Sequence, residues 1–436
     1  MNKKNILSEK NTIFAVNLKR TMNNLKHLLL LLACMTSIGM QAQRNEILSL
    51  NLRSLQVTSG GNWLDLPVTN LHGGQPIQIS FDDLTHEYRR LVYKVEHCEA
   101  DWTVSKQLFE SDYIEGFADG NTIDDMHESV NTNTQYTHYR FRIPNDRCRL
   151  KMSGNYRVTV YDGNDGHTLL RACFMVVEPM MGIALRASSN TDLDINGRHQ
   201  QVAMELSYGP FNITNPEREV KTVLMQNGRW SQAKINVKPQ YQTGDGMRWE
   251  HCRDYVFNGG NEYRKFEMLD DSHATMGLES VNWDGHQYHA YVWTDEPRPS
   301  YVYDESANGS FLIRKSDDTD VDFSSEYIVV HFRLKAPRQL GEVYVNGVWT
   351  HDRFTPEYRM TYNAVENCYE TSLLLKQGYY SYQYVVARED GSTAPLASEG
   401  NFYQTENDYQ ALVYYRGPGE RTDRLVGYAK INTAGK

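Results

Sequence analysis

The sequence lacks the motifs that mark several common enzyme classes. It contains no GxSxG nucleophile elbow, no phosphate-binding loop, no GxGxxG fingerprint and no Cys-x-x-Cys pair. The two strings closest to a metalloprotease motif begin at His86 and His127, and both lack the second histidine one helical turn later. With no catalytic constellation in the sequence, we expect a protein that is not an enzyme and uses no cofactor.

Cysteine is scarce and widely spaced. Of the six cysteines in 436 residues, five follow residue 42: Cys98, Cys148, Cys173, Cys252 and Cys368. An odd number at these spacings indicates neither a zinc site nor a disulfide-dense scaffold. We expect buried thiols, with a single Cys98–Cys148 bridge as the alternative in an oxidising compartment.

Only one long apolar run is present, at Leu28–Met40, and it is too short for a comfortable membrane span. Basic residues precede the run and Gln41-Ala42-Gln43 follows it, which is the pattern of a signal peptide cleaved near Ala42. Met22 gives this signal a more ordinary start than Met1, so residues 1–21 read as an upstream extension. Lipidation at Cys34 is the alternative. Either form predicts export to the periplasm.

Positive charge is also in short supply. Removal of residues 1–42 takes away six Lys/Arg and one Glu and changes the formal net charge from −10 to −15. An acidic exported protein is a poor partner for nucleic acids or anionic lipid surfaces. The composition still supplies a core, with 29 Tyr, 14 Phe and 7 Trp at a mean hydropathy of −0.62. At about 100–200 residues per domain, we expect three domains.

Helical periodicity is scarcely visible, whereas short alternating segments bounded by turn dipeptides recur. Asn-Gly and Asp-Gly pairs, which suit tight hairpins, begin at Asn196, Asn227, Asn258, Asn308, Asn346, Asp119, Asp162, Asp165, Asp245, Asp284 and Asp390. This pattern predicts an all-β protein of tandem immunoglobulin-like β-sandwich domains. We place the domains at 44–178, 180–318 and 322–416, followed by a tail at 417–436.

A strand that begins at Thr137 illustrates how single residues are interpreted. Tyr139, Phe141 and Ile143 alternate with His138, Arg140 and Arg142, and Pro144 ends the run. We therefore expect His138 to be a solvated strand residue, with a role on a partner-binding polar face as the alternative.

Two other features have a structural and a functional interpretation. In the segment 259–266, two glycines favour a β-bulge, and Glu262 and Arg264 would share a strand face within reach of an ion pair; an exposed recognition patch is the alternative. The adjacent acids Asp82 and Asp83 should point to opposite faces of a strand, so they cannot form a catalytic carboxylate pair.

A succession of short motifs resembles the type IX secretion system plug protein family of the Bacteroidetes. The motifs are SFDDL (80–84), HCEADWTVS (97–105), DYIEGF (112–117), SVNT (129–132), YTHY (136–139), IPN (143–145), SGNY (153–156), NEYR (261–264), QGYYSYQYV (377–385), EGNFYQTENDYQ (399–410) and VYYR (413–416). The resemblance implies a non-catalytic periplasmic protein that closes the periplasmic opening of an outer-membrane translocon β-barrel, its partner, with no small-molecule substrate.

The same motifs supply candidate residues for the partner interface or for the fold. These are Asp82, Asp83, His97, Asp101, Trp102, Asn131, Tyr136, His138, Asn261, Glu262 and Arg264.

A second resemblance supports a rival function. The segments VYVNGVWTHDRFTPEYRM and KQGYYSYQYVV are similar to early immunoglobulin-like and glycogen-binding modules, in which exposed aromatic rings stack on sugars. Trp349 is the candidate glycan contact of a periplasmic or surface glycan-binding protein. A third hypothesis, a secreted cargo, rests on the ending LVGYAKINTAGK, which resembles a sorting tail.

Overall fold

The computed structural model describes residues 45–389 and 391–434. The expected signal peptide, its cleavage near Ala42 and lipidation at Cys34 lie outside the described residues. Within the described ranges, no helix is both long and apolar enough to span a bilayer.

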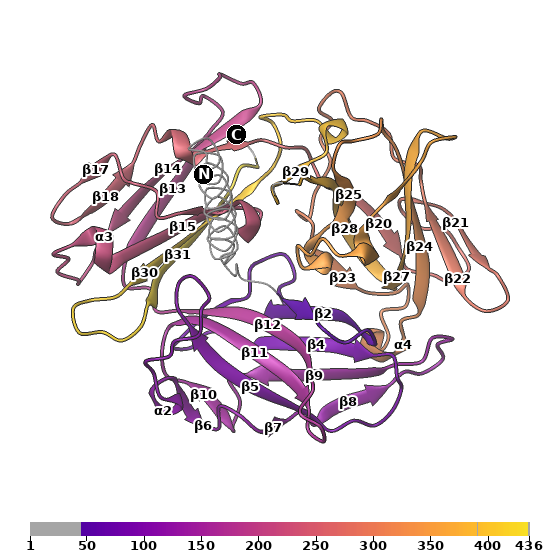
Figure 1. The fold of residues 1–436 in the computed structure, drawn as a ribbon, viewed down its shortest axis with the longest axis horizontal. Coiled ribbons are helices and arrows are strands. Elements are labelled where there is room, and N and C mark those ends of the chain that lie inside the picture. Colours follow the sequence, from indigo (N-terminus) through magenta and orange to yellow (C-terminus); the bar gives the residue numbers. More distant parts are fainter. Residues whose placement is uncertain (1–44, 390, 435–436) are drawn as a thin grey trace, which may run out of the picture. The chain divides into compact units, whose positions relative to one another are not determined.

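Two packed sheets form the N-terminal part of the chain (Figure 1). One sheet has the order β1-β12-β11-β5-β7, with β3 paired to β12, and the other has the order β2-β4-β9-β8. A short β10-β6 pair and helix α2 flank them. The bounds are β1 Glu46–Ile47, β2 Leu52–Ser59, β3 Val68–Asn70, β4 Ile77–Asp83, β5 Leu91–Cys98, α2 Glu110–Tyr113, β6 Ile114–Gly116, β7 Asn121–Thr122, β8 Asp125–Glu128, β9 Thr137–Ile143, β10 Cys148–Leu150, β11 Gly154–Asp162 and β12 Thr168–Val177.

The middle of the chain and its end share a second pair of sheets. Strands β13-β14-β18-β17, with β19 paired to β14, form one sheet, and β16-β15-β30-β31 form the other. The bounds are β13 Gly182–Ser188, β14 His199–Ser207, α3 Pro216–Glu219, β15 Val220–Gln226, η1 Trp230–Gln232, β16 Lys234–Ile235, β17 Tyr241–Gln242, β18 Gly246–Trp249, η2 Arg253–Tyr255, β19 Val256–Asn258, β30 Asp408–Tyr415 and β31 Arg424–Asn432.

A third pair of sheets lies between these two segments in the sequence. One contains β20-β28-β23, with β25 and β29 also paired to β28, and the other has the order β21-β22-β24-β27-β26. The bounds are β20 Arg264–Met268, β21 Leu278–Trp283, β22 Tyr288–Val292, β23 Phe311–Ile313, α4 Val321–Ser324, β24 Tyr327–Lys335, β25 Glu342–Asn346, η3 Val348–Thr350, η4 Pro356–Tyr358, β26 Thr361–Asn363, β27 Cys368–Lys376, β28 Gly378–Ala387, β29 Thr393–Pro395 and η5 Ala397–Glu399.

The all-β prediction is confirmed, because strands arranged in several sheets make up most of the regular structure. Alternation explains the cores: Tyr139, Phe141 and Ile143 of β9 pack inward with Ile79 and Phe81 of β4. The stripe Tyr380, Tyr382 and Tyr384 of β28 is likewise buried core.

The predicted limits 180–318 and 322–416 do not follow the sheets and are corrected. Strands β20 and β23 pair with β28, whereas all of β15 pairs with β30. Local hairpin signals report which neighbouring strands pair, but they carry no information about partners far along the chain. The predicted tail at 417–436 contains β31, in which Leu425 and Val426 are fully buried.

We propose three modules that follow the three hydrophobic cores instead. The N-terminal module comprises residues 45–178, the central module residues 180–258 and 405–434, and the C-terminal module residues 261–399. Only the first keeps the limits expected from the sequence.

Cys98 and Cys148 are buried thiols and are not bridged. Burial raises the pKa of each thiol to about 12, so both stay protonated and unreactive. Cys173, Cys252 and Cys368 are buried as well.

Removal of residues 408–436 is expected to unfold the central module, because β30 and β31 supply one half of its second sheet and buried Tyr409, Ala411, Val413 and Val426. Limited proteolysis should then cut within residues 180–258 while the N-terminal module persists. A truncated chain that resists cleavage like the full chain would contradict this discontinuous module.

Candidate functional site

Asp82 lies at the centre of a buried polar cluster between the N-terminal and C-terminal modules. Its Oδ1 lies 2.6 Å from His138 Nδ1 on β9, and its Oδ2 lies 2.6 Å from Lys376 Nζ at the end of β27. The Tyr327 hydroxyl, at the start of β24, donates to the same Oδ2 at 2.7 Å. One carboxylate therefore joins two modules through two side chains of the C-terminal module, Lys376 and Tyr327.

Lys376 is buried almost completely and has two further partners. Its ammonium donates to the Asp322 carbonyl at 2.5 Å and lies 4.1 Å from the centre of the Tyr136 ring, a cation–π contact. Burial opposes the charged form of Asp82, but Lys376 and His138 outweigh it and hold the pKa of Asp82 below its usual value. Asp82 is therefore ionised at neutral pH, whereas burial lowers the pKa of Lys376 from its usual value.

The expectation that His138 is solvated is wrong. His138 of β9 lies directly opposite Asp82 of β4, and only 5% of the residue is exposed. The alternation along β9 is as predicted, but the C-terminal module covers the second face of this sheet. Sequence alternation identifies the two faces of a strand and does not show whether another module covers the polar one.

Asp83 points away from Asp82, as adjacent strand residues must. Its Oδ2 accepts from Arg89 Nη1 at 2.9 Å, and Arg89 also binds Asp162 at 2.9 Å. The arginine thus fastens the end of β4 to the turn after β11. Asp162, which begins one of the Asp-Gly turns, is held by this contact.

The loop that contains Asn131 attaches to the start of the C-terminal sheet. Asn131 has a φ of +59°, a conformation that Asn tolerates better than most residues, and it turns the chain after β8. The Val130 amide donates to the Phe323 carbonyl at 2.8 Å, and the Thr134 amide donates to Glu326 at 3.1 Å. Tyr136 adds a hydrogen bond of 2.8 Å to the Ser325 carbonyl.

His97 belongs to a second junction, between the N-terminal and central modules. Its Nε2–H donates to the Ser153 carbonyl at 3.2 Å, so the neutral ring accepts at Nδ1 from the Ser105 hydroxyl at 2.9 Å. Thr422, in the loop between β30 and β31, lies 2.9 Å from Ser105. Gly154 permits this packing, because an added Cβ would clash with the His97 ring.

Asp101 and Trp102 lie in the turn beside this junction. Asp101 accepts from the Thr103 amide and hydroxyl and so stabilises its own turn, whereas Trp102 packs edge-on against Trp230 of the central module with ring centres 5.5 Å apart.

A buried carboxylate reinforces the same contact. Asp423 accepts from the Ala100 amide at 3.0 Å, from Lys221 at 2.8 Å and pairs with Arg416 at 3.1 Å. Arg416 also pairs with Glu99.

The expected Glu262–Arg264 ion pair does not form. Arg264 pairs instead with Asp295 at 2.6 Å and with Glu399 at 3.1 Å. Glu262 precedes β20, and its Oε1 accepts from the Tyr301 hydroxyl and the Glu406 amide, both at 2.9 Å. Burial raises the pKa of Glu262.

Asn261 completes this third cluster by donating to the Glu399 carbonyl at 2.7 Å. Together these contacts fix the segment that leads from the C-terminal module back to β30.

Trp349 does not present a ring to solvent, contrary to the glycan-binding expectation. Only 6% of the residue is exposed, and its indole N–H donates to the Ser381 carbonyl at 3.0 Å. It packs edge-on against Tyr380 in the core of the C-terminal module. Resemblance to a sugar-binding sandwich therefore reflects core packing at this position.

The arrangement is suited to holding modules together. Among residues 45–389 and 391–434, no group of three or more His, Cys, Asp or Glu side chains could hold a metal ion. The motif residues Asp82, His138, Tyr136, His97 and Trp102 all contact another module or the residues that support such a contact.

Sequence reasoning missed the partners of these residues. Lys376, Asp295, Glu399 and Asp423 lie 31 to 323 residues from the motif residues that they contact. The only local signal is a lysine that ends the apolar strand 368–376, directly before Gln377 and Gly378.

Lys376→Met is expected to lower the free energy of unfolding by about 3–5 kcal/mol, because it leaves a buried carboxylate without its cation. Lys335→Met is a matched control, since Lys335 ends the adjacent strand β24 and its pair with Glu296 has side chains 58% and 65% exposed. The free energy of unfolding of this control should fall far less, because an exposed ion pair contributes little to stability. Urea denaturation followed by tryptophan fluorescence measures both, and equal losses would contradict the assignment.

Stability should also fall between pH 6.5 and about 4 because of His97. Burial lowers the pKa of His97 from 6.5 to about 4, so in this range the unfolded chain binds a proton that the folded chain excludes. The stabilisation that depends on neutral His97 is fully present above pH 6.5 and is lost as the pH falls towards 4. His97→Gln should flatten the pH dependence of the unfolding midpoint, whereas His127→Gln, whose side chain is 49% exposed, should leave it unchanged. Parallel curves for wild type and His97→Gln would refute the role of His97.

Comparison with known proteins identifies the family of the N-terminal module. The profile described as "Type 9 secretion system plug protein 1st domain" matches residues 52–178. No curated protein matches the sequence.

One solved structure resembles nearly the whole chain. It is a hypothetical protein from Parabacteroides merdae with 37% identity and a TM-score of 0.86, and the match covers 90% of this chain and 100% of that chain.

Two streptococcal structures are far more distant. The C-terminal domain of the antigen I/II-family protein AspA from Streptococcus pyogenes has 8% identity and a TM-score of 0.16, with 88% of this chain and 99% of that chain covered. The C-terminal domain of the Streptococcus agalactiae AgI/II polypeptide BspA has 8% identity and a TM-score of 0.14, with 89% and 99% covered. These scores are too low to show a shared fold.

The family profile covers the module that contains Asp82, His97, Asn131 and His138, and it agrees with the resemblance found in the motifs. The chain therefore belongs to the type IX secretion system plug protein family and is a structural component of that secretion system.

Proposed function

We propose that the protein binds the outer-membrane translocon β-barrel of the type IX system and closes its periplasmic opening. The observation that carries this proposal is the family match over residues 52–178. A periplasmic location, reached through a cleaved signal peptide, agrees with this role and is part of the proposal.

The module junctions support a closing function. A plug must keep its shape against a large opening, and three sandwiches joined by flexible linkers would not. Here the buried Asp82–Lys376 pair joins the N-terminal and C-terminal modules, and Asp423 with its partners joins the N-terminal and central modules. A buried charge that loses its partner is costly, so these contacts resist separation of the modules.

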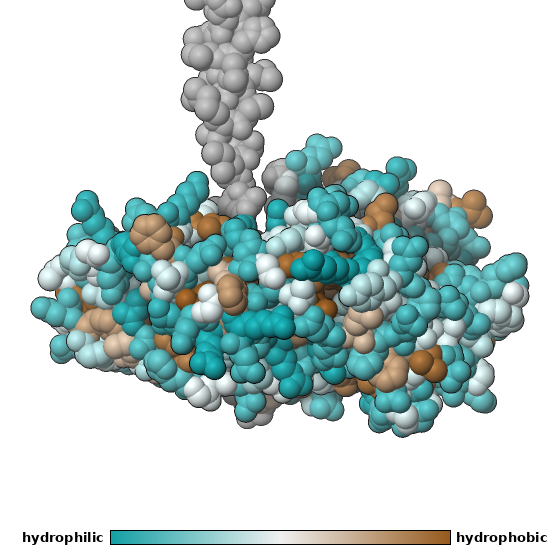
Figure 2. All heavy atoms as spheres, turned by 90° about the horizontal axis from the view of Figure 1, so that it is seen from below, coloured by the Kyte–Doolittle hydropathy of each residue, from teal (hydrophilic) through white to brown (hydrophobic). Residues whose placement is uncertain are grey.

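The surface supports reversible engagement. The face in Figure 2 is mostly hydrophilic, with hydrophobic residues in small separate groups. Exposed large apolar side chains such as Phe109, Phe117, Tyr88 and Trp293 come from different segments of the chain. A contact that forms and dissociates is better served by a polar surface with a few apolar side chains than by one large apolar patch.

Most of the motif residues are proposed to shape the plug and not to contact the barrel. Asp82, His97, His138 and Glu262 are at most 5% exposed, so a partner cannot reach them without opening the protein. Contacts with the translocon are assigned to exposed side chains, whose positions the buried junctions fix.

Gentle-detergent purification of a C-terminally tagged, chromosomally expressed chain is expected to recover one very large outer-membrane barrel in near-stoichiometric amount, identified by mass spectrometry. Adding the protein to the isolated barrel in planar bilayers should lower its conductance. Recovery of the protein alone, or a barrel whose conductance is unchanged by saturating protein, would contradict the proposal.

Lys376→Met provides a structural test of the same function. It should reduce recovery of the barrel more than Lys335→Met does, because only the first substitution loosens a module junction. Circular dichroism of both variants establishes that each retains its strands. Equal recovery with both would mean that the junction does not support binding.

A further inference from the structure

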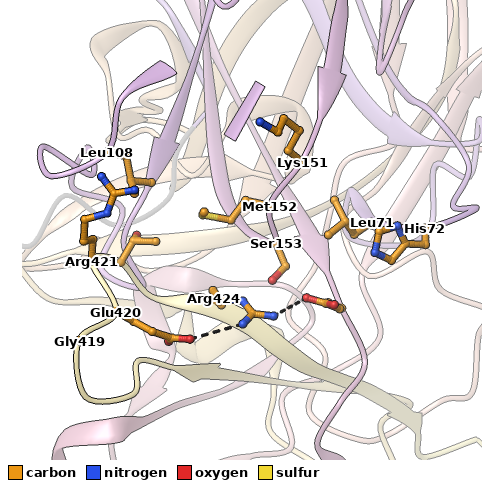
Figure 3. Close-up of a pocket in the computed structure, with 12 residues that line it drawn as sticks. Leu71, His72, Leu108, Lys151, Met152, Ser153, Gly419, Glu420, Arg421 and Arg424 are labelled. Atoms are coloured by element: carbon orange, nitrogen blue, oxygen red, sulfur yellow. Dashed lines mark hydrogen bonds and ion pairs between the residues drawn. The ribbon is translucent and has the colours of Figure 1, made fainter. Parts of the chain in front are cut away.

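A cavity of about 440 Å³ lies between the N-terminal module and the loop that joins β30 to β31 (Figure 3). Leu71, Leu108 and Met152 line it with apolar surface, Arg421 enters from the loop, and Arg424 enters from the start of β31. Its volume is within the range of about 300–1,000 Å³ typical of ligand sites, which occur preferentially at domain interfaces.

Ser153 contributes an unpartnered hydroxyl to this cavity. The residue is fully buried, and its Oγ has no hydrogen-bond partner among the described residues. In Figure 3 its side chain and the Arg424 guanidinium point into the same space. The backbone of Ser153 is held in place, because its carbonyl accepts from His97 and Gly154 packs against that ring. Buried hydroxyl groups normally have a partner, and this one, on the wall of the cavity, lacks the hydrogen bond that a ligand atom inside the cavity would supply.

Lys151, two residues earlier, contributes a positive charge that forms no ion pair within 4.0 Å among the described residues, although it attracts Asp112 from a longer distance. Its ammonium donates to the Ser111 carbonyl at 2.6 Å, and no carboxylate of the described chain lies within 4.0 Å of it. The two arginines differ from it. Arg424 pairs with Glu178 at 2.5 Å and Glu420 at 3.5 Å, and Arg421 pairs with Asp112 at 2.8 Å. Lys151 is thus the cation left for a ligand.

We propose that this cavity binds a peptide carboxylate that lies next to an apolar side chain. The carboxylate accepts hydrogen bonds from Lys151 and Ser153, and the apolar side chain packs on Leu71, Leu108 and Met152. Glu178 and Glu420 also line the space, and they disfavour ligands with several negative charges, such as phosphate groups. The carboxylate is either the C-terminus of a peptide or the side chain of an aspartate or glutamate.

This site adjoins the His97 junction, because Ser153 and Thr422 belong to both, and it does not require that the protein close a translocon. Binding is measured on the isolated full chain, whereas the plug function is measured on the barrel. Failure of one therefore leaves the other unaffected.

Isothermal titration calorimetry with three acetylated tetrapeptides tests the proposal. The probes are Ala-Ala-Ala-Leu with a free C-terminus, its C-terminal amide, and Ala-Ala-Asp-Leu amide. At least one carboxylate peptide should bind saturably, with an affinity about tenfold or more above that of the neutral amide. The stronger of the two carboxylate peptides identifies the source of the carboxylate. Absence of saturable binding by both, or equal binding of all three, would overturn the proposal.

Two substitutions locate the binding to this cavity. Lys151→Gln and Ser153→Ala should each lower the affinity for the carboxylate peptide by about tenfold. The exposed control Lys335→Gln should bind the peptide like the wild type. Both variants are expected to melt at the wild-type temperature, because one changes an exposed side chain and the other removes an unpartnered hydroxyl. Folded variants that bind with unchanged affinity would place the peptide elsewhere and refute the site.

Discussion

The arrangement of the N-terminal and C-terminal modules depends on the removal of two opposite charges from water. Transfer of one ion into a protein interior costs several kcal/mol. The attraction between two ions offsets this cost only when their geometry is good and their remaining hydrogen-bond donors and acceptors also have partners. Asp82 meets these conditions with His138, Tyr327 and Lys376, and the ammonium of Lys376 adds a carbonyl and an aromatic face. Each partner comes from a different strand or from the end of one, so the cluster is complete only when the two modules meet in a single register.

Polar junctions differ from apolar ones in how narrowly they define a relative position. Two apolar surfaces can slide past each other at little cost, because the hydrophobic effect is not directional. A carboxylate between an imidazole, a phenol and an ammonium tolerates little displacement, since a small shift leaves a buried group unsatisfied. The three clusters around Asp82, Asp423 and Arg264 use this property at three places in the chain. The protein thus obtains one defined shape from modules that each have their own core.

The fold class and the core faces of many strands followed from the sequence, because alternation and turn dipeptides are local signals. The pattern of β9 correctly separated Tyr139 and Phe141 from His138. Burial of His138 did not follow, because it depends on Tyr327 and Lys376, almost 200 residues or more away. The predicted domain limits failed for the same reason, because β15 pairs with β30 although the whole C-terminal module lies between them in the sequence. The family motifs identified important positions, yet only the structure shows that Asp82 and Arg264 hold segments together and that Trp349 is core.

The discontinuous central module gives the chain an unusual order of completion. Strands β13 to β19 are synthesised early, but their second sheet is incomplete until residues 408–432 exist. The intervening C-terminal module can form its own two sheets first and so shorten the effective loop that must close. The second module in the sequence is thus the last to be finished during biosynthesis. Until then its apolar face stays open to chaperones and proteases, which gives the cell a means of removing chains that end prematurely.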